Sequence, residues 1–142
     1  TQMLRFYHHL GHAFVPHLNA SGKLFMSQFS KGKLADYCRH CKFESITPKS
    51  IVGQEALAHE LDLTAKRGYA LNDEENIPGT RCFAVPIFND KGTIIAAVSV
   101  SGTIFQMPLD QIPTMVSVVN NILDQFYREY APLLILDNIF DL

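Results

Sequence analysis

The sequence predicts an α+β fold, with an antiparallel sheet flanked by helices and a long helix near the C-terminus. In the first half of the chain, apolar residues recur at helical spacing. Two β-rich runs then flank Asn89-Asp90-Lys91-Gly92, a sequence that favours a hairpin turn. Finally, a long amphipathic segment begins near Asp110.

The composition is that of one globular domain. With 142 residues, of which 47% are hydrophobic and 18% charged, residues 1–142 are expected to form a single folded unit. A formal net charge of −2 lacks the basic excess of a DNA-binding domain. No apolar run approaches the roughly 20 residues that span a membrane, and three cysteines favour reduced thiols, so a cytoplasmic location is expected.

The first predicted element is a strand over Met3–His8, and Gly11 after it indicates a bend. A helix is then expected to begin near Asn19, capped by Asn19 or Ser21. Its apolar side consists of Leu24, Phe25 and Phe29. Ser30 is expected to cap a second helix. The apolar spacing on that helix predicts a buried face made of Leu34, Tyr37, Cys38 and Cys41.

A third helix is predicted over Gln54–Arg67, and Gly68 ends it. Its inward side chains are Leu57, Leu61 and Ala65. After Gly68 the chain becomes β-like: Tyr69–Asn72 is extended, and Cys82–Phe88 and Thr93–Ser101 form the hairpin. The loop before the hairpin carries Asp73, Glu74 and Glu75. We interpret these as solvated acidic residues, with a cation site as the alternative.

The long helix is expected to be capped by Asp110, with Pro113 tolerated in its first turn. Its predicted inward stripe is Ile112, Met115, Val116, Val119, Ile122, Leu123 and Phe126. The segment Pro132–Leu142 is unusually apolar for the end of a sequence, so we expect it to pack against another surface.

The second hairpin strand indicates a candidate pocket. Side chains alternate along a strand, so Ile95, Ala97, Ser99 and Ser101 are expected on one face. Cys82, Ala84 and Pro86 are at matching parity on the partner strand. A thiol and two hydroxyls on an apolar sheet suit a ligand pocket. The alternative is that neighbouring backbone groups satisfy these hydroxyls.

The helix start Asn19–Lys23 is a second candidate element, because free amides at a helix N-terminus attract carboxylate or phosphate. An ordinary capped helix is the alternative. The stretch lacks the glycine spacing of a phosphate-binding loop, which excludes nucleotide hydrolysis.

Metal binding, redox chemistry and catalysis have weaker support. Cys38 and Cys41 match CxxC, but both lie on the apolar helical stripe and no second ligand pair follows. A cluster of histidines could bind a transition metal, although solvated turn histidines are the simpler interpretation. It comprises His8, His9, His12 and His17. Cys82 is the candidate nucleophile, because Ser99 and Ser101 have no neighbouring histidine or paired acid in sequence to activate them. We therefore expect no cofactor, no metal and no enzyme.

Taken together, these segments resemble the C-terminal domain of IclR-family transcriptional regulators from about Met3 to Tyr127. The resemblance depends on an ordered series rather than on one motif. The series is His17, Gly22-Lys23, Phe43, Thr47-Pro48, Gly68-Tyr69, Asp73-Glu74-Glu75, Gly79, Cys82, Ala84, Pro86, Phe88, Gly92 and Ala96–Gly102.

The resemblance implies a GAF-like domain, in which a curved antiparallel sheet flanked by helices binds a small effector. It implies that DNA is read by a separate N-terminal winged helix-turn-helix. We expect that module, and the start of this domain, to lie before Met3. The implied effector is a small organic, sugar or aromatic acid, and the implied assembly is a homodimer or homotetramer without membrane contact.

The resemblance also implies an effector site. Backbone amides near Ala20 and Ser21 and the side chains of Cys82, Ser99 and Ser101 would contact the effector. Apolar walls would come from Met3, Phe6 and Phe14. Asn72 stands where the family usually has an acidic residue, and an amide there removes a charge that would repel an anion. The alternatives are an oligomerisation module without ligand and a cysteine enzyme using Cys82.

Overall fold

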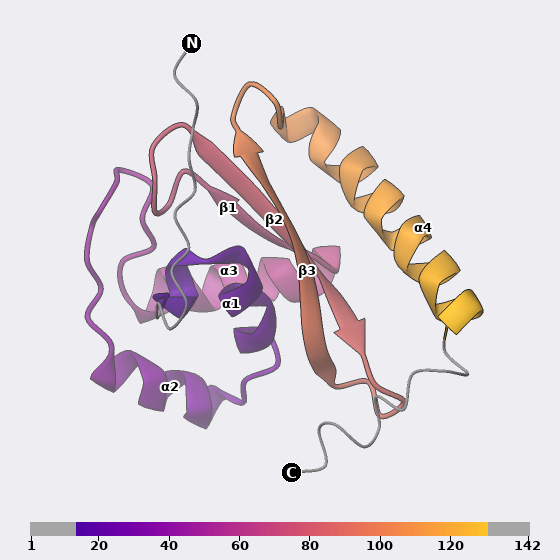
Figure 1. Cartoon of the computed structure of the whole chain (residues 1–142). Coiled ribbons are helices and arrows are strands. Elements are labelled where there is room, and N and C mark those ends of the chain that lie inside the picture. The colour runs from indigo at the N-terminus through magenta and orange to yellow at the C-terminus, as the bar shows by residue number, and fades with distance from the viewer. Residues whose placement is uncertain (1–13, 131–142) are drawn as a thin grey trace.

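The computed structural model describes residues 14–130 and confirms the α+β class: a sheet with helices on both sides, ending in a long helix (Figure 1). The elements are η1 Pro16–Leu18, α1 Ala20–Met26, α2 Lys31–His40, α3 Gln54–Arg67, β1 Ala70–Asp73, β2 Thr80–Phe88, β3 Ile94–Thr103, η2 Leu109–Gln111 and α4 Ile112–Tyr130. Predicted segments Met3–His8 and Pro132–Leu142 lie outside the described residues.

The helix ends follow local capping chemistry. The side chains of Asn19 and Ser30 accept hydrogen bonds from backbone amides in the first turns of α1 and α2, as predicted. Gly68 ends α3 in the left-handed conformation, with φ of 78°. Asp110 does not cap α4, because it lies within the short helix η2 that leads into it.

The described sheet has the strand order β1-β2-β3 and is antiparallel throughout. Helix α1 packs on one face, with α2 and α3 on the same side, whereas α4 packs on the other (Figure 1). Alternation along β2 explains the two layers. Ala84 lies in the cluster beneath α1, whereas Phe83 and Val85 pack against Ile112 and Val116 of α4.

The alternation predicted for β3 fails at one end. Ala96 pairs with Ile87, but the next pair is Ile94 with Phe88, so an irregularity leaves Ile95 without an opposite residue. Ile94 therefore packs with Ala97 in the α1-side cluster, where we had expected Ile95. A bulge reverses the parity of every residue before it, and this one is not marked by a glycine.

Three predicted helix faces are also partly wrong. On α1, Phe25 is 39% exposed, whereas Leu24 and Met26 are buried. On α3, Ala65 is exposed and Thr64 is buried beside Leu57 and Leu61. On α4, Ile122 and Phe126 are 61% and 44% exposed, so the buried stripe is narrower than predicted. Apolar character alone does not show which side of an amphipathic helix meets the sheet.

None of the helices within residues 14–130 combines the length and apolar character needed to cross a membrane.

Candidate functional site

A cavity of about 340 Å³ lies between the start of α1 and the sheet. Its lining comes from segments far apart in the sequence: the η1–α1 region, the loop after β1, and facing positions of β2 and β3. The lining residues are Phe14, Leu18, Asn19, Ala20, Ser21, Asn72, Asn76, Ile77, Thr80, Arg81, Cys82, Ser99 and Ser101. A cavity of this size suits a small metabolite.

The structure brings seven of the nine predicted site residues together around this cavity, and they are Phe14, Ala20, Ser21, Asn72, Cys82, Ser99 and Ser101. Met3 and Phe6 lie outside the described residues. The resemblance did not predict Asn76, Ile77 and Thr80, which come from the loop after β1 and the start of β2. Loop residues carry no periodicity that would show where they point.

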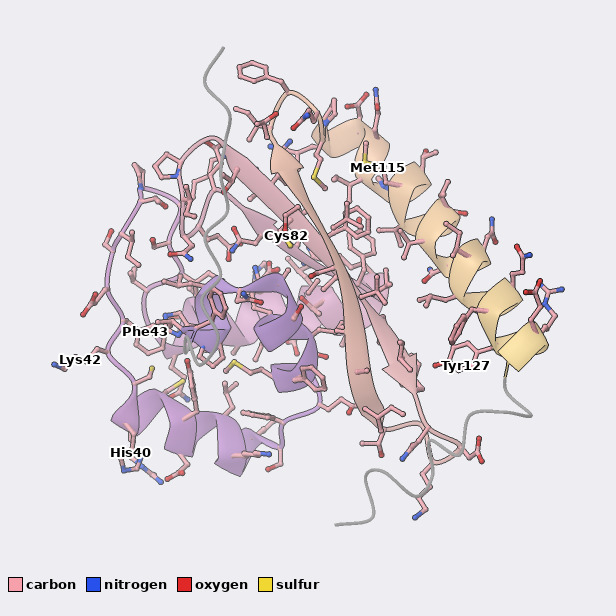
Figure 2. All side chains as sticks on the ribbon, in the orientation of Figure 1. His40, Lys42, Phe43, Cys82, Met115 and Tyr127 are labelled. Carbon is pink, nitrogen blue, oxygen red and sulfur yellow. The ribbon has the colours of Figure 1, made fainter. Side chains whose placement is uncertain are left out.

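The thiol and hydroxyl face was predicted correctly. Cys82 pairs with Ser101, and Ala84 pairs with Ser99, so these side chains share one face of the sheet. Figure 2 shows Cys82 near the centre of the molecule, on the sheet. Ser99 and Ser101 are both exposed. Their hydroxyls are therefore accessible at the rim of the cavity rather than sealed in the core.

Cys82 is a poor candidate for a nucleophile. Burial raises the pKa of its thiol, and the nearby Ser101 hydroxyl and Lys23 ammonium oppose that rise only in part. Its sulfur lies 3.7 Å from the carbonyl oxygen of Phe83. A neutral thiol at physiological pH is weakly nucleophilic and acts here as a small, mildly polar wall.

The start of α1 is fixed against the segment before it. The Asn19 side chain accepts a hydrogen bond from the Gly22 amide at 3.3 Å. A Cβ atom at Gly22 would lie only 2.4 Å from the carbonyl oxygen of Pro16, so only glycine allows this close approach. The amides of Ala20 and Ser21 have no partner within the helix, and both residues line the cavity.

Asn72 joins two walls of the cavity. Its side-chain amide donates to the carbonyl of Leu18 at 2.6 Å, and its side-chain oxygen accepts from the amide of Glu75 at 3.1 Å. The side chain is therefore engaged by the protein on both ends. We predicted Asn72 as an effector contact. In the structure, its two hydrogen bonds hold η1 against the loop after β1.

The expected solvated acidic loop is wrong, because all three carboxylates are paired. Asp73 accepts from Arg81 at 2.7 Å and from Lys49 at 2.9 Å, and Glu74 accepts from Lys49 at 2.7 Å. These cations hold the pKa of Asp73 below its usual value despite burial, and Lys49 lowers the pKa of Glu74. Glu75 is buried.

Glu75 belongs to a buried charge network that sequence reasoning missed. The Lys23 ammonium, fully buried, lies 2.7 and 2.8 Å from the two oxygens of Glu75 and 3.1 Å from Glu60. Arg67 also donates to Glu60, at 2.6 Å. Burial raises the pKa of Glu75, and the Lys23 ammonium opposes that rise. The network ties α1, α3 and the cavity loop together.

His17 is also not the solvated histidine we expected. It is fully buried, and its Nδ1 lies 2.7 Å from the hydroxyl of Tyr37, while its ring packs on Phe43. Its Nε2 has no hydrogen-bond partner. Burial and the nearby Lys23 lower the pKa of His17, so the ring is neutral near pH 7.

For metal binding, no group of three or more potential ligands gathers within residues 14–130. Cys38 and Cys41 are half-buried, and burial raises the pKa of both thiols. His8, His9 and His12 lie outside the described residues.

The cavity lining is largely uncharged where the structure describes it. Arg81 is the one charged side chain among its named residues, and its guanidinium is engaged by Asp73 and by the carbonyl of Met107. The groups that remain for a ligand are hydroxyls, a thiol, the Asn76 side chain and backbone amides. These neutral donors and acceptors favour a small, oxygen-rich molecule.

Comparison with known proteins identifies the class. A family model described as the C-terminal domain of the bacterial transcriptional regulator IclR matches residues 1–126. The chain therefore belongs to this family of transcriptional regulator domains.

Individual relatives agree. The HTH-type transcriptional regulator XynR of Escherichia coli is 35% identical over 95 residues, covering 67% of this chain and 38% of that protein. The transcriptional repressor IclR of Escherichia coli is 30% identical over 112 residues, covering 79% of this chain and 41% of that protein. The chain thus spans about two fifths of these relatives. Both are named as regulators of transcription and not as enzymes.

Solved structures share the fold. The structure of Thermotoga maritima IclR matches with a TM-score of 0.76 and 30% identity, covering 90% of this chain and 52% of that one. A double mutant of the inducer-binding domain of the PobR transcription factor from Acinetobacter, solved with 3-hydroxybenzoic acid, also has a TM-score of 0.76. It is 22% identical, and the match covers 89% of this chain and 73% of that chain.

Proposed function

We propose that this chain is the effector-binding domain of a bacterial transcriptional regulator, and that the cavity between α1 and the sheet binds a small organic-acid-like metabolite. The main support for this proposal is that seven predicted residues line one cavity of about 340 Å³. A binding site requires residues from separate elements to converge on one cavity, and these residues come from four elements. Such convergence would be improbable by chance.

In this proposal the ligand is held by neutral donors. Its carboxylate accepts hydrogen bonds from the hydroxyls of Ser99 and Ser101 at the rim and from the amides of Ala20 and Ser21. The apolar lining, which includes Leu18 and Ile77, contacts its carbon skeleton. A small organic, sugar or aromatic acid fits this chemistry. The complex of the related PobR domain with 3-hydroxybenzoic acid supports an acid as the class.

Regulation would follow from unequal affinity. A ligand shifts a protein between two arrangements only to the extent that it binds one of them more tightly. We propose that the effector does so here and thereby modulates a separate N-terminal winged helix-turn-helix, which alone contacts DNA. In the whole regulator we further propose a homodimer or homotetramer in the cytoplasm, without a cofactor.

Isothermal titration calorimetry tests the proposal directly. The chain is titrated with a panel of small organic, sugar and aromatic acids, and at least one is expected to bind reversibly without being consumed. The double variant Ser99→Ala, Ser101→Ala should weaken that binding by about tenfold to a hundredfold, as expected when one or two hydrogen bonds to a charged group are lost.

The matched control is the double variant Thr114→Ala, Ser117→Ala, which removes two exposed hydroxyls from α4, on the other side of the sheet. Its affinity should equal that of the unaltered chain. Equal affinity in both double variants would remove the assigned site, while turnover of the ligand would favour an enzyme that uses Cys82.

A further inference from the structure

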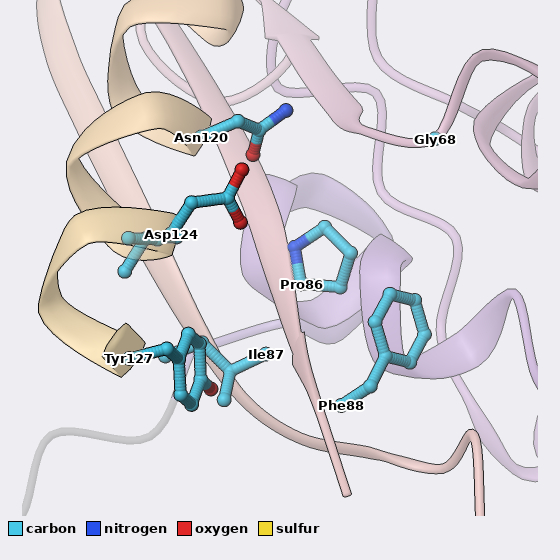
Figure 3. A pocket seen from close by; sticks show the side chains of 8 residues that line it. Gly68, Pro86, Ile87, Phe88, Asn120, Asp124 and Tyr127 are labelled. Atoms are coloured by element: carbon cyan, nitrogen blue, oxygen red, sulfur yellow. The ribbon is translucent and has the colours of Figure 1, made fainter. Parts of the chain in front are cut away.

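A second hollow, of about 420 Å³, lies between the last turns of α4 and the end of β2, away from the effector cavity (Figure 3). It is lined by Gly68, Pro86, Ile87, Phe88, Asn120, Leu123, Asp124 and Tyr127. In Figure 3, Tyr127 on the helix lies beside Ile87 on the strand, and Phe88 marks the lower edge of the groove. We call this hollow the α4 groove.

Large apolar side chains around the α4 groove are incompletely buried. Phe88 is 51% exposed, and Ile87 and Leu123 are only half-buried. Clustered apolar exposure of this kind commonly marks a surface that packs against something. The groove continues the layer in which Phe83 and Val85 pack against α4. An apolar occupant would therefore extend an existing core.

We propose that the C-terminal segment Pro132–Leu142 of the same chain folds back and packs in the α4 groove. This segment is the most apolar stretch outside the described residues, and its large apolar side chains are Leu133, Leu134, Ile135, Leu136, Ile139, Phe140 and Leu142. It begins two residues after α4 ends at Tyr130, and Tyr127 on the last turn of α4 lines the groove.

The local sequence favours a reversal at this point. Pro132 cannot continue a helix, and it disfavours helical backbone in the residue before it. In this proposal the chain therefore leaves the helix axis beside the groove. The eleven residues from Pro132 onward, at up to about 3.5 Å each, are long enough to span the two turns from Tyr127 back to Asn120.

Entropy favours this occupant over a second copy of the chain. Only a few residues separate the segment from the groove, so closing the loop costs little and the effective concentration is high. A second protein molecule would have to lose translational and rotational freedom to occupy the same surface. Docking within one chain should therefore be independent of protein concentration.

Tryptophan fluorescence tests the proposal, because the chain contains no tryptophan. Phe88→Trp puts a single indole at the edge of the groove, at a position exposed enough to accept the larger ring. In the full chain the indole should emit at shorter wavelength and be poorly quenched by acrylamide. A chain that stops after Ala131 should show red-shifted emission and stronger quenching, and a synthetic peptide of residues 132–142 should reverse both changes.

The control variant is Phe105→Trp, because Phe105 is 87% exposed and lies in the turn after β3, outside the groove lining. Its emission and quenching should be the same in both chain lengths. Equal quenching at position 88 with and without the segment would overturn the proposal. So would shielding that disappears on dilution, which would assign the groove to a second copy. The pair Leu133→Glu, Leu136→Glu in the full chain should reproduce the truncated spectrum.

Discussion

Lys23 is one side chain on which three parts of the fold depend. Its ammonium is fully buried between Glu75, in the cavity loop, and Glu60, on α3. Without this cation the buried Glu75 carboxylate would lose its ion-pair partner, whereas Glu60 would keep its pair with Arg67. An unpaired carboxylate in the core is costly unless it takes up a proton. Removing one partner of the Lys23–Glu75 ion pair should therefore lower the stability strongly, although forming such a buried pair contributes little net stability.

Lys23→Met is therefore expected to lower the free energy of unfolding by about 3–5 kcal/mol, the range observed when one partner of a buried ion pair is removed. Urea denaturation measures the change. Lys66→Met, at an exposed position on α3, should stay within about 0.5 kcal/mol of the unaltered chain. A small effect at position 23 would mean that the network contributes little.

Asn72 allows a more specific test, because its contact with Leu18 depends on one donated hydrogen bond. Asn72→Asp keeps the shape but replaces the donor that meets the Leu18 carbonyl with an acceptor, so we expect a loss of about 1–3 kcal/mol in the free energy of unfolding. Asn76→Asp alters another residue of the cavity lining and should cost much less. Thermal unfolding of both variants compares them, and similar losses would count against the bridging role.

His17 predicts a dependence of stability on pH. Burial and Lys23 lower its pKa in the folded chain below the ordinary value of about 6.5, so the unfolded chain binds more protons in that range. The contribution of His17 is fully present above about pH 6.5 and is lost as the pH falls toward its folded pKa.

Denaturant titrations between about pH 7 and pH 5 should show this loss of stability. The variant His17→Gln should have a flatter dependence of the free energy of unfolding on pH. His59→Gln, at an exposed site on α3, is expected to retain it. If the slope of His17→Gln matched that of the unaltered chain, the titrating group would lie elsewhere.

Two glycines in neighbouring helices show how packing overrides helix propensity. Gly22 in α1 has no room for a Cβ against Pro16, whereas a Cβ at Gly32 in α2 would meet nothing closer than 4.0 Å. Alanine favours a helix over glycine by up to about 1 kcal/mol. Gly32→Ala is thus expected to raise the stability slightly.

Gly22→Ala should instead lower the stability by about 1–3 kcal/mol, because the clash is with backbone that cannot turn aside. Thermal unfolding of the two variants gives the comparison. Equal gains in both would show that α1 and η1 are not held in close contact.

Local chemistry explains which elements could be predicted. Caps at Asn19 and Ser30, and the glycine end of α3, depend on residues within one or two turns, and all were found. The bulge near Ile95 and the exposed side of α4 were not found. Both depend on what packs against the element from elsewhere in the chain, which a single segment does not encode.

For the candidate site, too, local features could be predicted and contacts between distant parts of the chain could not. Strand parity alone placed Cys82, Ser99 and Ser101 on one face, because alternation is a local property. The pairing of Lys23 with Glu75, 52 residues away, required the folded chain. Charged residues are usually solvated, and sequence gives no sign of the few that are buried in pairs.

The molecule as a whole is a sheet with one side given to a cavity and the other to α4. We propose that the effector binds on the cavity side. Amide chemical shifts of the isotopically labelled chain, recorded as the best-binding acid from the calorimetric panel is added, test it most directly. The largest shifts should fall on Ala20, Ser21, Cys82, Ser99 and Ser101. Shifts concentrated on α4, with the cavity residues unmoved, would contradict it.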